Sequence, residues 1–361
     1  MRFVDEYRDK DSAGALLDAI GRATSKSLKF MEVCGSHTVA IFKSGIRDML
    51  PENISLVSGP GCPVCVTSVQ DVDRAIAIAG LPGVTLATFG DMVRVPGSES
   101  SLQRAKAGGA DVKVVYSPFD ALTFAQSNPG SNVVFFAAGF ETTAPTVAAT
   151  LSRAVEAGTS NFYVYCVHKT VPDAMRALLD SPDLMIDGFL CPGHVSTIIG
   201  TAPYRFIPEV YSKPAVISGF EPLDILQSTL MMVEQIEEGR PEVAVQYLRA
   251  VSGEGNPKAV DVMYRFFQPS DSNWRGIGVI PGSGLELRDE YAAHDAMKAF
   301  DINTPEPREP RGCSCGDVLR GRITPPQCRL FAKACTPDNP VGACMVSYEG
   351  SCAAYFKYGR R

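Results

Sequence analysis

The sequence has no apolar run that approaches the length of a membrane-spanning helix and no block of basic residues. A transmembrane helix needs about 20 consecutive apolar residues, and proteins that bind nucleic acids by neutralising phosphates carry clustered Lys and Arg. The formal net charge here is -6. We therefore expect neither a membrane nor a nucleic acid among the partners of this protein.

Several familiar cofactor motifs are also missing. Gly282-Ser-Gly284 lacks the third glycine of the dinucleotide fingerprint, and no Walker loop occurs. The cysteines do not form the closely spaced three-cysteine run of radical enzymes or the run of bacterial ferredoxins. Residues 1–11 carry too many charges for a secretory signal. We expect a cytoplasmic protein, whose odd number of cysteines in a reducing compartment argues against a purely structural disulfide framework.

Cysteine is what the sequence has in abundance, with 11 in 361 residues. The C-terminal tail concentrates them in a Gly- and Pro-rich segment without helical or strand periodicity, which predicts a module organised by metal rather than by a hydrophobic core. A 4Fe–4S cluster needs four thiolates, so two would be spare, and a site of four thiolates also accepts zinc. The tail cysteines are Cys313, Cys315, Cys328, Cys335, Cys344 and Cys352.

Short apolar runs rich in β-branched residues recur along the rest of the chain. Each is followed by a turn and a helical pattern, and helical patterns stop at Gly80 and Gly108. Continuous apolar runs that alternate with helices predict strands buried on both faces, hence parallel sheets and an α/β fold. The expected strands are residues 28–33, 54–57, 84–88, 112–116, 133–138, 162–167, 186–190, 215–217 and 277–280.

Two sheets fit the chain length better than one large sheet. A turn at residues 127–131 divides the first four expected strands from the rest, and residues 303–312 read as a Pro- and charge-rich linker. We expect two parallel-sheet α/β domains, residues 1–130 and 131–302, that face a cleft. A small cysteine-rich iron–sulfur domain then occupies residues 303–361.

Cysteine, histidine and acidic side chains gather just after the expected strands. In open α/β sheets, ligand sites lie outside the carboxyl ends of the strands. We therefore expect one cleft lined by thiols, imidazoles and carboxylates. Its candidates are Cys34, His37, Cys62, Cys65, Asp91, Glu141, His194 and Glu221.

Two of these turns carry specific chemistry. Gly61-Cys62-Pro-Val-Cys65 is a Cys-x-x-Cys turn, whose thiols can share a metal or close into a reversible disulfide. Cys34-Gly-Ser-His37 places a soft thiolate near an imidazole, which suits an iron or zinc ligand pair or a nucleophile with a base. In both cases incidental structural cysteines are the alternative.

A string of motifs resembles the HypD family of hydrogenase maturation proteins, and the match extends over essentially the whole chain. The motifs are Phe30-Met-Glu-Val-Cys-Gly-Ser-His-Thr38, Gly59-Pro-Gly-Cys-Pro-Val-Cys65, Thr88-Phe-Gly-Asp91, Gly139-Phe-Glu-Thr-Thr143, Pro192-Gly-His-Val-Ser196, Gly219-Phe-Glu-Pro-Leu223 and Met345-Val-Ser-Tyr-Glu-Gly-Ser-Cys352. The resemblance implies two α/β domains and a small 4Fe–4S domain. It also implies a small maturation chaperone (HypC) and a cyanide-donating protein (HypE) as partners.

With those partners, the family assembles the iron centre of nickel–iron hydrogenases, which carries cyanide and carbon monoxide. The resemblance implies that Cys34 holds iron with His37 beside it, and that Cys62 and Cys65 are a redox pair or further iron ligands. It implies a scaffold with a redox role rather than a conventional enzyme. The implied cluster ligands are Cys315, Cys328, Cys335 and Cys352, which leaves Cys313 and Cys344 spare.

Two other functions compete with assembly of a metal centre. One is an iron–sulfur disulfide reductase that uses Cys62 and Cys65 on a thiol substrate. The other is a zinc-stabilised hydrolase with Cys34 as its nucleophile. Infrared bands from bound cyanide and carbon monoxide would support assembly over both.

Overall fold

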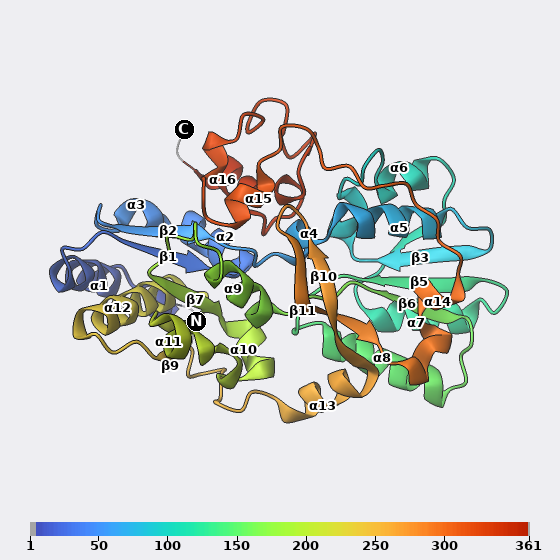
Figure 1. The fold of residues 1–361 in the computed structure, drawn as a ribbon, viewed down its shortest axis with the longest axis horizontal. Coiled ribbons are helices and arrows are strands. Elements are labelled where there is room, and N and C mark those ends of the chain that lie inside the picture. The colour runs from blue at the N-terminus through green and yellow to red at the C-terminus, as the bar shows by residue number, and fades with distance from the viewer. Residues whose placement is uncertain (1–4, 360–361) are drawn as a thin grey trace.

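The computed structural model describes residues 5–359. Residues 1–4, where the charged N-terminal segment begins, lie outside the described part. Two parallel sheets occupy the two ends of an elongated molecule, and the cysteine-rich tail lies above them (Figure 1). Within residues 5–359, no helix has the combined length and apolarity that crossing a bilayer requires. The expected α/β class with parallel sheets is confirmed.

The first sheet has five parallel strands in the order β2-β1-β7-β8-β9. Its central strands are almost wholly buried, which explains their continuous apolar sequence. The strands are β1 (Leu28–Glu32), β2 (Ile54–Ser58), β7 (Gly188–Pro192), β8 (Ala215–Ser218) and β9 (Val243–Val245).

The second sheet has four parallel strands in the order β4-β3-β5-β6. Its two central strands are buried along almost their whole length. The strands are β3 (Val84–Thr88), β4 (Val112–Val114), β5 (Asn132–Ala137) and β6 (Phe162–Cys166).

The expected division of the strands at residues 127–131 is wrong. Strand β3 pairs directly with β5 across that point, with Val84 opposite Asn132. Strand β1 pairs instead with β7, with Phe30 opposite Gly188. The chain therefore leaves the first sheet after β2, builds the whole second sheet, and returns to complete the first.

An antiparallel hairpin lies between the two sheets. Strands β10 (Phe267–Trp274) and β11 (Gly278–Leu287) pair with each other, so the strand expected at residues 277–280 is not part of a parallel sheet. The hairpin joins the end of β6 through hydrogen bonds from Thr170 N–H to Ser283 and from Leu285 N–H to His168. It thus connects the second sheet to the middle of the molecule (Figure 1).

Helices cover both faces of each sheet. Helices α1 and α12 pack together against the first sheet, and α7, α8 and α13 cover one face of the second. The longer helices are α1 (Lys10–Ala23), α2 (Gly35–Ser44), α5 (Val69–Ala79), α7 (Pro118–Ser127), α8 (Ala144–Glu156), α9 (Val171–Leu179), α12 (Pro222–Glu238) and α13 (Pro257–Phe266). The shorter ones are α3 (Ile46–Met49), α4 (Pro63–Val66), α6 (Leu102–Ala107), α10 (Gly193–Ile199), α11 (Phe206–Tyr211), α14 (Ala296–Ala299), α15 (Cys315–Leu319) and α16 (Ser351–Tyr358).

The tail packs across the junction of the two sheets rather than apart from them. Helix α16 contacts α2, and the short 3-10 turn Ala343–Met345 contacts α4. Both contacted helices begin at a predicted thiol turn. The fold therefore brings the tail cysteines and the strand-end cysteines to the same side of the molecule.

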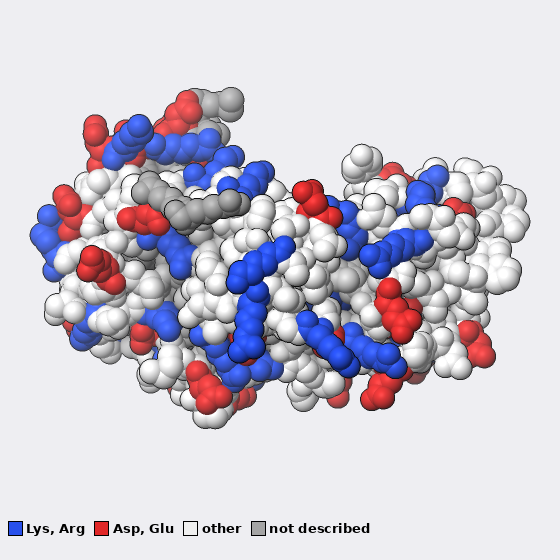
Figure 2. Space-filling model, turned by 90° about the horizontal axis from the view of Figure 1, so that it is seen from above, with Lys and Arg blue, Asp and Glu red and all other residues white. Residues whose placement is uncertain are grey.

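On the face seen in Figure 2, Lys and Arg form short rows with Asp and Glu among them.

Candidate functional site

The two thiol turns at the carboxyl ends of β1 and β2 touch each other. Cys34 is the N-cap of α2, and Cys62 is the N-cap of α4. The Gly35 N–H donates to the Gly61 carbonyl at 3.0 Å. A Cβ atom on Gly61 would lie 2.1 Å from the Cys34 nitrogen, so only glycine permits this close approach. The neighbouring strands thus bring the two predicted cysteine motifs into one site.

The Cys34 thiol lies in a buried position and is only 1% exposed. Its Sγ lies 3.5 Å from Nε2 of His194, at the start of α10. Burial raises the pKa of the Cys34 thiol, although the backbone N–H groups of His37 and Ser36 oppose that effect. Burial also lowers the pKa of His194. The pair is therefore a neutral thiol beside a neutral imidazole.

His37, which the sequence places beside Cys34, contacts other groups. Its Nε2 lies 2.9 Å from the Gly219 carbonyl oxygen and 3.3 Å from that of Ser218, so Nε2 carries the proton. Its buried Nδ1 has no hydrogen-bond partner among the described residues. Burial lowers the pKa of His37 to about 4. The neutral ring stacks on Phe220 at a centroid distance of 4.6 Å.

Phe220 holds both histidines in place. The His194 ring also stacks on Phe220, at 4.9 Å and 16°. The Phe220 ring in turn meets Tyr247 edge-on at 5.8 Å. The two imidazoles therefore have fixed orientations, with His194 directed toward the Cys34 sulfur.

Cys62 and Cys65 are both buried at the ends of the short helix α4. The Cys65 N–H lies 3.3 Å from the Cys62 sulfur. Burial raises the pKa of the Cys65 thiol, and the neighbouring Cys62 adds to the effect. The Cys352 and Glu349 side chains of the tail also raise this pKa. The Cys-x-x-Cys turn thus lies between the Cys34 position and the tail.

A carboxylate from the tail enters the strand-end site. Glu349 accepts a hydrogen bond from the Ser36 hydroxyl at 2.6 Å. A Cβ atom on Gly35 would lie 2.5 Å from the Glu349 Cβ, so the two segments are in close contact. The acidic side chain raises the pKa of both Cys34 and Glu32. The tail is therefore part of the site and not only its neighbour.

A second carboxyl group, that of Glu32 at the end of β1, is buried behind Cys34. Its Oε2 accepts a hydrogen bond from the Cys34 N–H at 3.1 Å, and Oε1 accepts one from the Thr38 hydroxyl. Burial raises the pKa of Glu32 to about 8. Near neutral pH the group is therefore mostly protonated, which keeps a second negative charge away from the thiol.

We expect this buried acid to make stability depend on pH. The folded protein binds the Glu32 proton up to about pH 8, whereas an unfolded chain releases it near its ordinary pKa of about 4.3. The unfolding free energy should therefore fall by up to about 1.4 kcal/mol per pH unit within that window. Glu32→Gln should remove the Glu32 contribution and leave that of buried Glu141, whose pKa is also raised to about 8, so urea unfolding between pH 5 and 8 should show a smaller slope. An unchanged slope in the variant would contradict the assignment.

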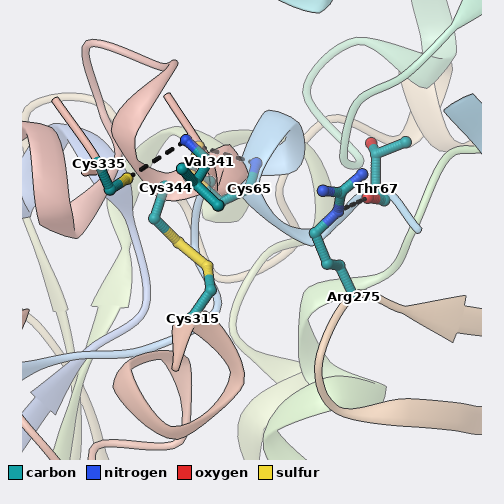
Figure 3. Close-up of a disulfide and its surroundings, with 8 residues drawn as sticks. Cys65, Thr67, Arg275, Cys315, Cys335, Val341 and Cys344 are labelled. Atoms are coloured by element: carbon teal, nitrogen blue, oxygen red, sulfur yellow. Dashed lines mark hydrogen bonds between the residues drawn. A yellow bond between two sulfur atoms is a disulfide. The ribbon is translucent and has the colours of Figure 1, made fainter. Parts of the chain in front are cut away.

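The six tail cysteines line one small cavity, including Cys313 and Cys344, which the resemblance leaves spare. Apolar side chains complete its lining, including Val318, Leu330, Phe331 and Met345. Cys335 is buried and accepts a hydrogen bond from the Val341 N–H at 3.4 Å (Figure 3). Cys315 and Cys344 form a disulfide with a Cα–Cα distance of 6.5 Å. The cysteines that line the cavity are Cys313, Cys315, Cys328, Cys335, Cys344 and Cys352.

The donor set consists of thiols, which are the ligands of iron–sulfur clusters and of structural zinc. Among residues 5–359, no three Cys, His, Asp or Glu side chains are arranged to hold one ion. A 4Fe–4S cluster spreads its four thiolates over four irons and so needs a wider arrangement in a dry cavity. Burial raises the pKa of Cys313 to about 11. The pKa of Cys328 is lowered, because backbone N–H groups outweigh the effect of burial.

The other predicted residues do not reach the Cys34 sulfur. Exposed Asp91 contacts the tail, where it accepts a hydrogen bond from the Ser347 hydroxyl at 3.4 Å. Buried Glu141 accepts from the Val171 N–H at 2.9 Å and caps α9. Glu221 caps α12 and forms an ion pair with Arg8 at 2.5 Å. Of these acidic and histidine candidates, only His194 lies against the thiol.

The sequence interpretation did not single out Phe220, Glu32 or Glu349. All three stand inside quoted motifs, but nothing in their spacing shows that they meet around Cys34. An open pocket with a volume of about 470 Å³ borders the site and is lined partly by Ser36, Phe220 and Glu349. The pocket is thus lined by two neighbours of the site's residues, Ser36 in the Cys34 turn and Phe220 beneath His194, and is large enough to receive part of another molecule.

Comparisons with known proteins show the family of the chain. A family model described as "Hydrogenase formation hypA family" (HypD) matches residues 11–359. The hydrogenase maturation factor HypD of Rhizobium leguminosarum bv. viciae is 48% identical, over 100% of this chain and 96% of its own length. The protein of the same name from Escherichia coli K12 is 47% identical, over 99% of this chain and 98% of its own length. The chain therefore belongs to the HypD family.

Proposed function

We propose that the protein is a hydrogenase maturation factor that assembles an iron centre carrying cyanide and carbon monoxide. Cys34 anchors the iron, which is the cargo of the reaction. The observation that carries the proposal is the meeting of three elements around one buried thiol. These are His194 at 3.5 Å from the Cys34 sulfur, the Cys-x-x-Cys turn in backbone contact, and Glu349 from the cysteine-rich tail.

The state of Cys34 suits a metal anchor better than a hydrolytic nucleophile. A nucleophilic cysteine needs a lowered pKa, whereas burial raises that of Cys34. A soft metal displaces the thiol proton on binding, so a buried neutral thiol becomes a ligand when iron arrives. His194 Nε2 is placed to accept that proton. The carboxylate of Glu349 can then compensate the charge of the imidazolium.

The Cys62 and Cys65 thiols are the proposed local source of electrons. Closing them into a disulfide releases two electrons and two protons. Because both are buried, they are poorly placed to attack a disulfide on a macromolecular substrate, which weighs against a reductase. Gly61, the residue before Cys62, is in backbone contact with Cys34, which supports delivery of their electrons to the metal site.

The tail cysteines are the proposed holders of a 4Fe–4S cluster. The resemblance assigns Cys315, Cys328, Cys335 and Cys352. Because Cys315 forms a disulfide with Cys344 in this structure, that bond must take up two electrons before Cys315 can serve as a thiolate ligand. A bound cluster supplies one-electron transfer. The tail itself contributes a dry cavity and fixes its position beside α4.

The proposed partners are a small HypC-like chaperone and a HypE-like cyanide donor. The pocket formed partly by Ser36, Phe220 and Glu349 supports this part of the proposal, because it opens beside the buried thiol. Infrared spectroscopy of the protein purified with its small partner tests the function. Bands in the cyanide and carbon monoxide stretching region are expected. Their absence from an iron-loaded complex would favour the reductase or the hydrolase.

We expect Cys62 and Cys65 to interconvert between dithiol and disulfide. Alkylation followed by mass spectrometry, before and after mild reduction of the folded protein, should show two additional modified sites at these positions. Alkylation after unfolding is needed to count both, since neither is accessible in the native state. Cys191, also buried but unpaired, serves as the internal control and should be modified equally in both samples. Full modification of Cys62 and Cys65 before reduction, with normal maturation by either Ser variant, would contradict the redox role.

A further inference from the structure

The tip of the β10–β11 hairpin is inserted between the Cys-x-x-Cys turn and the tail. The Arg275 N–H donates to the Val66 carbonyl at 2.9 Å, at the end of α4. On the other side, Gly276 packs so closely on Gly316 that a Cβ atom would lie 2.6 Å from the Gly316 Cα. Gly276 has φ +68°, which suits glycine in this tight approach. The tip therefore contacts both thiol sites, and in the view of Figure 3 Arg275 lies beside Thr67, with Cys65 between it and the tail cysteines.

The Arg275 side chain is buried and only 2% exposed. Its Nε donates to the Thr67 carbonyl at 2.8 Å and Nη2 to the Pro96 carbonyl at 2.7 Å. Its buried Nη1 has no hydrogen-bond partner among the described residues. Arginine stays protonated in proteins, so a full positive charge is buried here with part of its donor capacity unused.

Nothing in the described chain neutralises this charge in the usual way. No Asp or Glu within residues 5–359 forms an ion pair with Arg275, whereas buried Lys169 has Asp71 at 3.9 Å. Burial lowers the pKa of Arg275. The negative charge of nearby groups raises it again, with Glu309 contributing most, followed by Cys313, Cys65 and Asp71. Glu309 is exposed to water and screened. Asp71 is shared with Lys169.

The remaining neighbours of the charge are the thiol sites. A buried cation without an anionic partner is costly, and removal from water is offset only by a charge of opposite sign. Hydrogen bonds to two carbonyls explain the position of the side chain but not its charge, since a neutral amide can also donate. A tail whose thiolates hold a cluster carries the missing negative charge, and reduction of that cluster adds one more.

We propose that Arg275 is a positioning residue whose buried positive charge stabilises the cluster in the cysteine-rich tail, the reduced form more than the oxidised form. The inference rests on the proposed cluster. The guanidinium binds the Thr67 carbonyl at the end of α4, and the next residue, Gly276, packs on Gly316 of the tail, so the charge lies near both thiol sites. The hairpin is thus an electrostatic element of the site.

The test compares the reduction potential of the reconstituted full-length protein with that of three variants, by redox titration followed by electron paramagnetic resonance. Arg275→Gln should lower the equilibrium constant for reduction at least tenfold, which is about 59 mV for one electron. Arg275→Lys keeps the charge and should recover most of the shift. Arg94→Gln is the matched control, because Arg94 binds the tail at the Val346 carbonyl from an exposed position. Its potential should equal that of the wild type.

The outcomes separate this inference from the function on which it rests. A wild-type protein that holds no iron and sulfide after reconstitution would overturn the cluster and the inference together. A loaded Arg275→Gln protein with an unchanged potential would overturn the inference alone. If Arg275→Gln loses the cluster, the Arg275→Lys variant distinguishes a role of the positive charge from a role of the hydrogen bonds. A loaded lysine variant with a nearly normal potential supports the role of charge, whereas an empty one means that the hydrogen bonds of the guanidinium are what matters.

Discussion

Cys34→Ala should abolish the cyanide and carbon monoxide bands of the complex with the small partner, and with them hydrogenase maturation. The thiol is the only sulfur in contact with His194 among the described residues, so no other ligand can replace it at that position. Iron bound outside the tail should fall to background while the tail keeps its iron and sulfide. Infrared spectroscopy and iron counting on the same sample measure both.

The matched control for that variant is Cys191→Ala. Cys191 is equally buried and lies in the neighbouring strand β7, but its sulfur forms no disulfide and no hydrogen bond within residues 5–359. Its replacement should leave the bands in place. Bands of full strength in Cys34→Ala, with its fold intact by circular dichroism, would mean that iron is anchored elsewhere.

Cys335→Ala should bleach the brown colour expected of the isolated protein and reduce its iron content by about four atoms. Cys335 is buried, lines the tail cavity and holds the Val341 N–H. The cysteines lie among the buried apolar side chains of the tail, so loss of the cluster should also lower the melting temperature of the protein. Absorption spectra, iron and sulfide analysis, and thermal unfolding test these expectations.

Cys166→Ala controls for the removal of a thiol as such. Cys166 ends β6, and its sulfur lies 3.6 Å from His168 Nδ1, outside the tail cavity. This variant should keep colour and iron. Stoichiometric zinc in a colourless wild-type protein, or a fully coloured Cys335→Ala protein, would contradict the proposed ligand set.

The sequence predicts the strands of this fold well and their partners poorly. Apolar runs locate each parallel strand except β9 (Val243–Val245), which is short and half-buried at the sheet edge. Pairing depends on contacts between distant segments, and nothing in the composition of β5 distinguishes a partner of β3 from a partner of β1. The sequence does not predict the hairpin strand β10, because Gln, Ser, Asp and Asn interrupt its apolar pattern.

The sequence predicts those parts of the candidate site whose chemistry depends only on the type of residue. Cysteine and histidine at strand ends identify Cys34, Cys62, Cys65 and His194. The exchange of roles between the two histidines is not predictable, because it depends on Phe220 stacking with both rings. The burial of Arg275 is equally unpredictable, because an arginine in a turn of a polar hairpin is expected at the surface.

The order of strands β2-β1-β7 has a consequence for the birth of the protein on the ribosome. The second sheet is one continuous stretch of chain and can close as soon as β6 has emerged. Strand β1, in contrast, is translated early and keeps an open edge until β7 (Gly188–Pro192) follows, on the order of ten seconds later at ordinary rates of synthesis. Unpaired apolar edges invite association between chains. We therefore expect this protein to be most prone to aggregation, and most dependent on chaperones, as a nascent chain that contains β1 to β6 but not yet β7.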